Sequence, residues 1–369
     1  MLNFDPERKL ADQIRVVENA IVVPWGRGQK RAMARPAGVL TTGGVFCEDA
    51  VTYRAASRPT TVQPEFPEPD EIKHEIKGTV LFGGMAYGHF GHALCESIAR
   101  LWALDAYAGQ IDQVLFLPKK KVTWPVRSLT LLKPMLRTLG EVPELTAIND
   151  PTRVERLVIA PQAFGVNDMI GGTPEFREFT DARWRQRIKA EGAEKIYISR
   201  SEVFRKRGRF LLEERIEAEL EKEGFTIFHP QQHDLETQLA QYKAAKVIVS
   251  TDNSALHLAA FVAGPACRVA ILLRRPGTIY HDFQEQLARF AAIKPMISDQ
   301  CTRYWFRAGE RTQMNEVISL IDFEQTGQAL AAAGIIANGH WTNPSEDEVA
   351  TALGDFEEQG EMTLTEIFP

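Results

Sequence analysis

Short apolar runs alternate with segments of helical periodicity between residues 192 and 275. The runs are rich in β-branched and aromatic residues, which is typical of strands, and the segments between them repeat apolar residues every three or four positions, as helices do. Regular alternation of this kind predicts a doubly wound, Rossmann-like parallel sheet. The expected strands are Lys195–Arg200, Phe225–His229, Val247–Ser250 and Arg268–Leu273, and the expected helices are Leu211–Glu223, Leu235–Ala245 and Ser254–Ala263.

A similar but looser alternation runs from about residue 78 to residue 161. Its expected strands are Val80–Gly84, Gln113–Pro118 and two runs between 144 and 161, with helices after the first strand and after Trp124. Apolar residues fill both faces of these strands, as in parallel sheets that are covered on both sides. The fold class predicted is therefore α/β, with two Rossmann-like domains in tandem that face each other across a cleft.

The remaining segments set the expected domain boundaries. Residues 1 to about 75 hold short β segments and proline-rich loops, so we expect an irregular β-rich segment that decorates the first domain without building it. The tail has helical character but little apolar surface, and we expect it to pack weakly or to return to the first domain. The expected parts are a first domain at 1–191, a second at 192–335 and an acidic C-terminal tail at 336–369.

Composition narrows the class of protein. With 369 residues, 44% hydrophobic and 25% charged, the chain fits a soluble protein of two domains. A net charge of −6 gives no reason to expect nucleic acid as a partner. The charged N-terminus does not resemble a signal peptide, and the four cysteines form no CxxC pair. We therefore expect a cytoplasmic protein without a zinc knuckle or a disulfide framework.

A stripe of polar residues follows the glycine-rich turn after the first strand of residues 78–161. His92, Glu96 and Arg100 are spaced four apart on an expected helix that starts near His89 or Phe90. One interpretation is an ordinary Glu96–Arg100 ion pair on a helix whose first turn His92 caps. The other is a ligand site at the helix N-terminus, approached over the glycines, with Glu96 as a general base. On the second interpretation, the glycines that admit the ligand are Gly83, Gly84, Gly88 and Gly91.

A second polar site is expected at the carboxyl ends of the strands of the second domain, where a doubly wound sheet opens its crevice. The strand from Lys195 ends with Ser199 and Arg200, and a basic loop follows. Such a loop is either a solvated surface or a phosphate site, because arginine can make bidentate contacts with phosphate. Between Arg200 and the Ser254 helix, an anionic ligand is expected. The basic residues of the loop are Arg205, Lys206, Arg207 and Arg209.

Four segments occur in the order and spacing seen in glycosyltransferase family 61. They are HFGHALCESIARLW, KIYISR followed by Arg209 and Glu214, FHPQQHDLETQLAQYKAAKVIVS, and DNSALHLAAF. The resemblance covers about residues 78 to 275 and points to the bacterial capsular and exopolysaccharide type. It implies an inverting, metal-independent GT-B enzyme that transfers a sugar from a nucleotide-sugar donor to a glycan or glycolipid acceptor, with 1–191 on the acceptor side and 192–335 binding the donor.

The resemblance also implies roles for individual residues. Glu96 matches the acid proposed as the catalytic base, with His92 beside it, and His89 and Arg100 are expected on the acceptor side. One departure stands out, because the family usually has His-Gly where this chain has Asp252-Asn253, and an acid beside a diphosphate would repel it. The residues expected to bind the donor are Ser199, Arg200, Arg209, Asn253, Ser254 and His257.

Two other functions remain open at this point. A metallohydrolase could use His89, His92 and Glu96 as ligands, although no His-Glu-x-x-His motif is present. A catalytically silent scaffold of a polysaccharide-assembly complex would keep the fold and lose donor binding. No cofactor or metal is expected, and peripheral association with the inner membrane or with an assembly complex is compatible with the sequence. The donor sugar, the acceptor, the linkage and the oligomeric state depend on loop shapes that motifs do not encode.

Overall fold

The computed structural model describes residues 4–5, 7–30, 33–203, 207–309 and 314–367. The chain divides into two compact units, residues 1–187 and 188–369, and each is described by itself. Both units contain sheets with parallel strands and helices, so the prediction of an α/β chain is confirmed.

The first unit is built on a six-stranded sheet of order β3-β1-β10-β7-β8-β9. The four strands from β10 to β9 are parallel, β1 is antiparallel to β10, and β3 is antiparallel to β1. The chain runs outward from β7 through β8 to β9 and then returns to the other side of β7 as β10. The carboxyl ends of β7 and β10 are thus the point where the strand order reverses, which is where ligands bind in sheets of this kind. The strands are β1 (Arg15–Val23), β3 (Gly38–Leu40), β7 (His74–Ala86), β8 (Gln113–Pro118), β9 (Glu144–Ala147) and β10 (Thr152–Ile159).

The N-terminal segment builds this sheet, so the prediction that it only decorates the domain is wrong. Arg15–Val23 pairs with β10 along most of its length and is buried at Ala20 and the three residues after it. Its run of consecutive apolar residues indicated a strand covered on both faces, but not the strand with which it pairs. Smaller ladders in the same segment join β2 (Arg35–Pro36) to β6 (Thr61–Val62) and β4 (Tyr53–Ala55) to β5 (Arg58–Pro59).

Between β7 and β8 the chain forms a broken helix where a continuous one was expected. Helix α1 (Phe90–His92) runs into a π-helical turn at Ala93–Ser97, and α2 (Ala103–Ala106) follows after irregular turns. The π turn and the irregular turns after it change the rotation per residue, so Arg100 no longer shares the stripe of His92 and Glu96, which stay in contact. Ser97 ties the π turn to the end of β7, because its hydroxyl donates to the Met85 carbonyl (2.8 Å). The other helices of the unit are α3 (Leu132–Thr138) and α4 (Pro174–Thr180).

Two glycines of β7 have packing roles. A Cβ on Gly83 would lie 2.5 Å from the Phe116 ring, and Gly84 has a φ of +83° at an irregularity in the β7–β8 ladder. Both are buried within the strand, so they do not open a path for a ligand. Gly88, beyond the end of β7, does have open space beside it.

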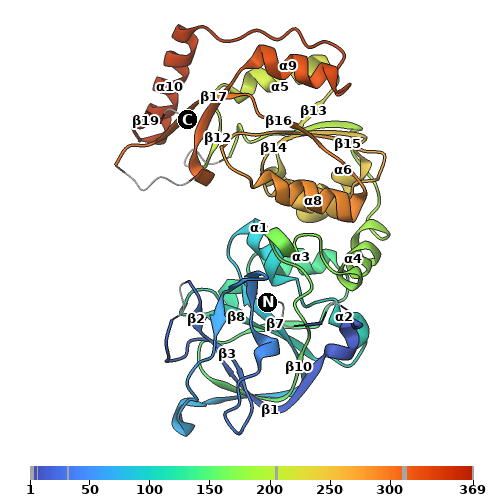
Figure 1. Ribbon diagram of the computed structural model, residues 1–369, viewed down its shortest axis with the longest axis vertical. Helices are drawn as coiled ribbons and strands as arrows, with labels where there is room; N and C mark the ends of the chain where they lie inside the picture. Colours follow the sequence, from blue (N-terminus) through green and yellow to red (C-terminus); the bar gives the residue numbers. More distant parts are fainter. Residues whose placement is uncertain (1–3, 6, 31–32, 204–206, 310–313, 368–369) are drawn as a thin grey trace. The chain divides into compact units, whose positions relative to one another are not determined.

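The second unit contains a five-stranded, fully parallel sheet of order β13-β11-β14-β15-β16. Numbered along the chain, its strands lie in the order 2-1-3-4-5, which is common in doubly wound sheets and reverses between β11 and β14. Figure 1 shows α5 and α9 on one face of this sheet and α8 on the other. The strands are β11 (Lys195–Ile198), β13 (Thr226–Phe228), β14 (Val247–Thr251), β15 (Arg268–Leu272) and β16 (Met296–Ser298). The helices are α5 (Glu213–Lys222), α6 (Leu235–Ala244), α7 (Ala255–Val262), α8 (Tyr280–Ala291) and α9 (Phe323–Ala332).

The acidic tail is part of the second unit, so the prediction that it packs weakly or returns to the first domain is wrong. Helix α10 (Glu346–Gly360) buries Val349 and Phe356 in the core of this unit, and the final strand pairs with β17. Two apolar residues on one face were enough to dock a helix that is otherwise acidic. A four-stranded sheet of order β12-β18-β17-β19 results, with strands β12 (Arg209–Phe210), β17 (Cys301–Arg307), β18 (Ile318–Ile321) and β19 (Leu364–Ile367).

Candidate functional site

Each unit has a polar cluster at the carboxyl ends of its parallel strands. In the first unit, the π turn after β7 brings His92 and Glu96 together, with 2.5 Å between His92 Nδ1 and Glu96 Oε1. The Glu96 side chain is fully buried, whereas 25% of the His92 side chain is exposed. Glu96 Oε1 therefore fixes Nδ1 as the protonated nitrogen, which leaves Nε2 as the proton acceptor of a neutral ring. The histidine is thus the member of the pair that a substrate can reach.

Two further rings surround His92. The Tyr87 ring centroid lies 5.5 Å from that of His92, and the His89 ring lies 5.4 Å away on the exposed surface. Burial raises the pKa of the Tyr87 hydroxyl, and the Glu96 carboxylate raises it further. Tyr87 therefore stays neutral and provides a hydroxyl-bearing wall beside the His92–Glu96 pair.

Arg100 does not pair with Glu96, so the prediction of a Glu96–Arg100 ion pair is wrong. Its guanidinium donates to the carbonyls of Asp49 (3.0 Å), Val51 (2.8 Å) and Ala160. Burial lowers the pKa of Arg100 to about 10, and only 1% of the residue is exposed. Arg100 fastens loops to the end of β10, and its guanidinium is not open to an acceptor.

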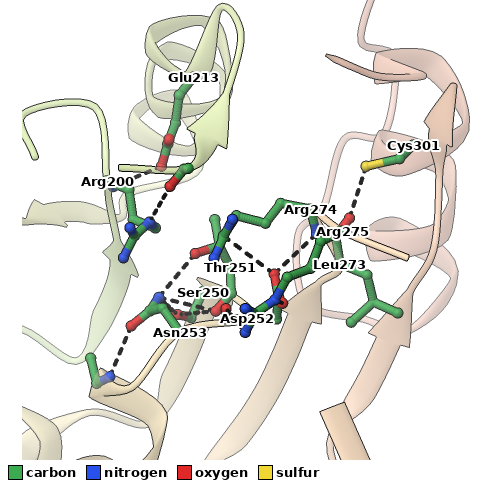
Figure 2. Close-up of polar contacts among 12 residues, drawn as sticks. Arg200, Glu213, Ser250, Thr251, Asp252, Asn253, Leu273, Arg274, Arg275 and Cys301 are labelled. Atoms are coloured by element: carbon green, nitrogen blue, oxygen red, sulfur yellow. Dashed lines mark hydrogen bonds and ion pairs between the residues drawn. The ribbon is translucent and has the colours of Figure 1, made fainter. Parts of the chain in front are cut away.

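In the second unit, Arg200 is the second residue after the end of β11. Its backbone N–H donates to Glu213 Oε1 (2.7 Å) and its Nε donates to the Gly208 carbonyl (2.8 Å) (Figure 2). Burial lowers the pKa of the Arg200 guanidinium, and the Glu213 carboxylate opposes this shift. Glu213 is buried in the first turn of α5, whereas Glu214, which belongs to the sequence motif, is exposed. The buried acid that holds Arg200 is thus one residue earlier than the sequence pattern suggested.

Two other residues expected to bind the donor have structural contacts. The Ser199 hydroxyl is buried and donates to Glu217 Oε1 (2.5 Å). Arg209 is 3% exposed, donates to the carbonyls of Ser201 and Val203, and stacks on a ring of α10. The buried Arg209 side chain therefore supports the start of the loop after β11 from the interior of the unit. Arg205 and Lys206 of the same loop lie outside the described residues, and Arg207 is exposed.

Sequence reasoning missed a pair of arginines after β15. Arg275 Nε donates to Asp252 Oδ2, and the Arg274 backbone N–H donates to Asp252 Oδ1 (3.1 Å) (Figure 2). Asp252, at the end of β14, is fully buried. Its carboxylate binds these two residues of the neighbouring strand end, so it serves as a counterion within the protein. The signal was available, since two consecutive arginines directly follow a predicted strand.

Arg274 is a buried cation whose side chain makes few hydrogen bonds. It is 3% exposed, and its Nε lies 3.6 Å from Asp252 Oδ1, which is an ion pair but not a hydrogen bond. Neither Nε nor Nη1 has a hydrogen-bond partner within the part of the chain that the structure describes. Burial lowers the pKa of Arg274 to about 9, although Asp252 opposes the shift. A buried cation with unused donors is poorly satisfied unless an anion completes its shell.

The loop after β14 is held by Asn253. Its amide group donates to the Ser250 hydroxyl (3.0 Å) and its Oδ1 accepts the Ala255 N–H (2.9 Å), so Asn253 caps α7. The Ser254 side chain makes no capping bond and is partly exposed. Arg200 follows β11 and Ser254 follows β14. Because these two strands are neighbours in the sheet, the two residues lie at adjacent strand ends, as expected.

His257 packs between α7 and α8. Its Nδ1 lies 2.6 Å from Gln286 Oε1, and Gln286 Nε2 donates to the His257 carbonyl (3.1 Å). The Phe283 ring packs against it in a tilted arrangement, with centroids 4.6 Å apart. These contacts favour the packing role for His257 over contact with a donor.

The described residues contain no group of three or more His, Cys, Asp or Glu side chains arranged to hold a metal ion, and His89, His92 and Glu96 form no such group. In the same part of the chain, no helix is long and apolar enough to cross a membrane.

The family model described as Glycosyltransferase 61 matches residues 90–270, which span the π turn, the Arg200 loop and the end of β14. The curated proteins contain no match to the chain.

Proposed function

Because the chain belongs to glycosyltransferase family 61, we propose that it is an inverting transferase that moves a sugar from a nucleotide-sugar donor to a glycan or glycolipid acceptor. Polysaccharide biosynthesis is the process that we propose for it. The observation that carries the proposal is the buried, incompletely bonded Arg274 among the arginines at the strand ends of the second unit. A diphosphate is the ligand that such a group of guanidinium donors fits best.

The proposed donor site consists of Arg200, Arg274 and Arg275, with the first turn of α7 beside them. In the transfer, the bond between the anomeric carbon and the diphosphate oxygen breaks, and its electron pair leaves with the diphosphate. Fixed cations stabilise this growing charge without reorganising, which is the largest contribution that a protein makes in many reactions. Because Asp252 is already bound by Arg274 and Arg275, it does not present a free carboxylate to the phosphate. This removes the reason to infer a silent scaffold from the Asp252-Asn253 sequence.

The proposed proton acceptor is the His92–Glu96 pair. The acceptor hydroxyl attacks the anomeric carbon from the face opposite the diphosphate, so the configuration inverts, and His92 Nε2 takes the hydroxyl proton. The buried Glu96 carboxylate keeps the ring in the correct tautomer and stabilises the imidazolium that forms. This refines the sequence-based role of Glu96 as the base, because the exposed ring is the group that an acceptor can reach. The GT-B arrangement, in which two domains bring such sites together, is part of the proposal.

The proposal is tested with the purified full-length chain and a panel of nucleoside diphosphates and nucleotide sugars. A bound ligand at about 100 times its dissociation constant adds roughly 2.7 kcal/mol of stability, which raises the melting temperature. We expect one nucleotide class to do so, and the transferred sugar to show an inverted anomeric configuration by NMR. Stabilisation without hydrolysis or transfer would instead indicate a protein that binds the donor but does not catalyse the transfer. No stabilisation by any nucleotide at millimolar concentration would overturn the donor site.

A further inference from the structure

A pocket of about 350 Å³ lies at the carboxyl ends of β7 and β8 in the first unit. No sequence motif pointed to it, since it joins the residues after two strands that are separated along the chain. It lies at the carboxyl ends of parallel strands, the side of such a sheet at which ligands bind, and it shares β7 with the β7–β10 position where the strand order reverses. The lining residues used below are Tyr87, His89, Lys119, Lys120, Val122 and Ser128.

Two residues that line the pocket, Tyr87 and His89, are also in ring contact with His92. Lys119 Nζ lies 4.9 Å from the centroid of the Tyr87 ring, and that ring lies 5.5 Å from the His92 ring. His89, on another wall, is also in ring contact with His92. A ligand in the pocket is therefore one side chain away from the proposed proton acceptor.

Positive charge gathers around this pocket. Burial lowers the pKa of Lys119; the Glu96 carboxylate opposes that shift, while the positive charges of Arg54, Lys120 and Arg35 add to it. Arg35 is fixed behind the pocket, because it donates to the carbonyls of Pro118 (2.7 Å) and Lys119 (2.8 Å). Neither Lys119 nor Lys120 forms an ion pair within the described part of the chain.

The ordinary interpretation of the run Lys119–Lys121 is a solvated basic surface. Two features argue against it for the first two lysines. All three lysines are exposed, but only Lys119 and Lys120 line the concave site, and Lys119 lies over the face of the buried Tyr87 ring. Glu96 carries one negative charge and is already in contact with His92. It therefore does not neutralise the several lysine and arginine side chains around the pocket.

We propose that this pocket is an acceptor subsite for a sugar that carries an anionic group, either the carboxylate of a uronic acid or a phosphate ester. Lys119 and Lys120 bind the anion, and this contact places a neighbouring hydroxyl near His92. The acceptor role rests on the function proposed above. The preference for an anion over a neutral sugar rests only on the pocket and its charges.

The test measures binding to the full-length chain without turnover. The probes are methyl β-glucuronide, glucose 6-phosphate and the neutral methyl β-glucoside, titrated by ligand-observed NMR. At least one anionic probe should bind about 10-fold more tightly than the neutral one, as for a charge-assisted hydrogen bond. The Lys119→Gln, Lys120→Gln double variant should lose this preference. A preference for glucuronide would identify a carboxylate as the natural anion, and a preference for the sugar phosphate would identify a phosphate.

Lys121→Gln is the matched control, because it removes one positive charge from the same run outside the pocket and should keep the preference. Equal binding of all three probes, or an anion preference that survives in the double variant, would overturn the proposal. Thermal stabilisation by nucleoside diphosphates is measured on the same preparations. Donor stabilisation without anion preference refutes the pocket alone, whereas anion preference without donor stabilisation refutes the transferase and leaves the pocket standing.

Discussion

The two polar clusters occupy the same place in their sheets but are built in opposite ways. In the second unit, regular parallel strands end in loops, and a buried acid from one strand end, Asp252, binds arginines from the next. In the first unit, a π turn forces His92 against a buried Glu96, and arginine is directed into the core. The first construction fixes positive charge, and the second holds the proposed proton acceptor. This is the division that a transfer from a diphosphate to a hydroxyl requires.

The largest expected effect is a loss of turnover in variants of the His92–Glu96 pair, while binding of the donor to the arginines of the second unit stays unchanged. Glu96→Gln and His92→Gln should each lower kcat by about 100-fold to 10,000-fold, as for loss of general base catalysis, with donor affinity unchanged. Because the two side chains act as a unit, the double variant should be little worse than either single one. The measurements are steady-state kinetics with the natural acceptor and calorimetry with the donor.

The His92 variant decides which member takes the proton. If Glu96 itself were the base, His92→Gln would cost much less than Glu96→Gln. Near wild-type turnover in both variants would remove this cluster from the chemistry altogether.

The next effect concerns the buried acid of the second unit. Asp252→Ala removes the carboxylate that Arg274 and Arg275 share, and breaking such a buried pair typically costs about 3 to 5 kcal/mol of folding stability. Chemical denaturation measures the loss. Glu285→Ala, which breaks an exposed ion pair with Arg289 in the same unit, is the control and should change stability little. A small effect in both variants would mean that Asp252 does not hold the arginines.

Strands β11, β13, β14 and β15 of the second unit and the helices α5, α6 and α7 between them could be predicted from sequence to within a few residues, and the broken helix of the first unit could not. Strand ends after β11, β14 and β15 follow from short apolar runs bounded by polar loops, so Arg200 was placed correctly. Arg274 and Arg275 follow the same rule, but two arginines are a weaker sequence signal than the four basic residues of the loop after Arg200. The π turn leaves Leu94 and Ile98 buried, as a regular helix would, so the apolar pattern does not distinguish the two.

Pairings over long distances in the sequence also escaped prediction. The β1–β10 ladder and the docking of α10 each depend on a partner more than a hundred residues away, and local periodicity carries no information about it. The same limit applied to Arg100, whose three carbonyl partners come from segments before and after its own.

A moderate effect is expected from the arginines that face the proposed diphosphate. Arg200→Ala and Arg275→Ala should each weaken binding of the nucleotide sugar and of the bare nucleoside diphosphate by about 1.5 to 3 kcal/mol, the range for a charged hydrogen bond. Arg207→Ala removes an exposed cation from the same loop as Arg200 and serves as the control. Unchanged affinity in the Arg200 variant would exclude that residue from the donor site.

The smallest effect tests whether the loop after β14 contacts the donor or only caps α7. Asn253→Ala removes the acceptor for the Ala255 N–H and should lower folding stability by about 1 kcal/mol, as is typical for a lost helix cap. Ser254→Ala removes a hydroxyl that makes no capping bond, so stability should hardly change, and donor affinity should fall if that hydroxyl faces the phosphate. Thermal melts and donor titrations on both variants separate the two roles. A stability loss in Ser254→Ala equal to that in Asn253→Ala would show that both residues are structural, and would restrict the charge site of the second unit to its arginines.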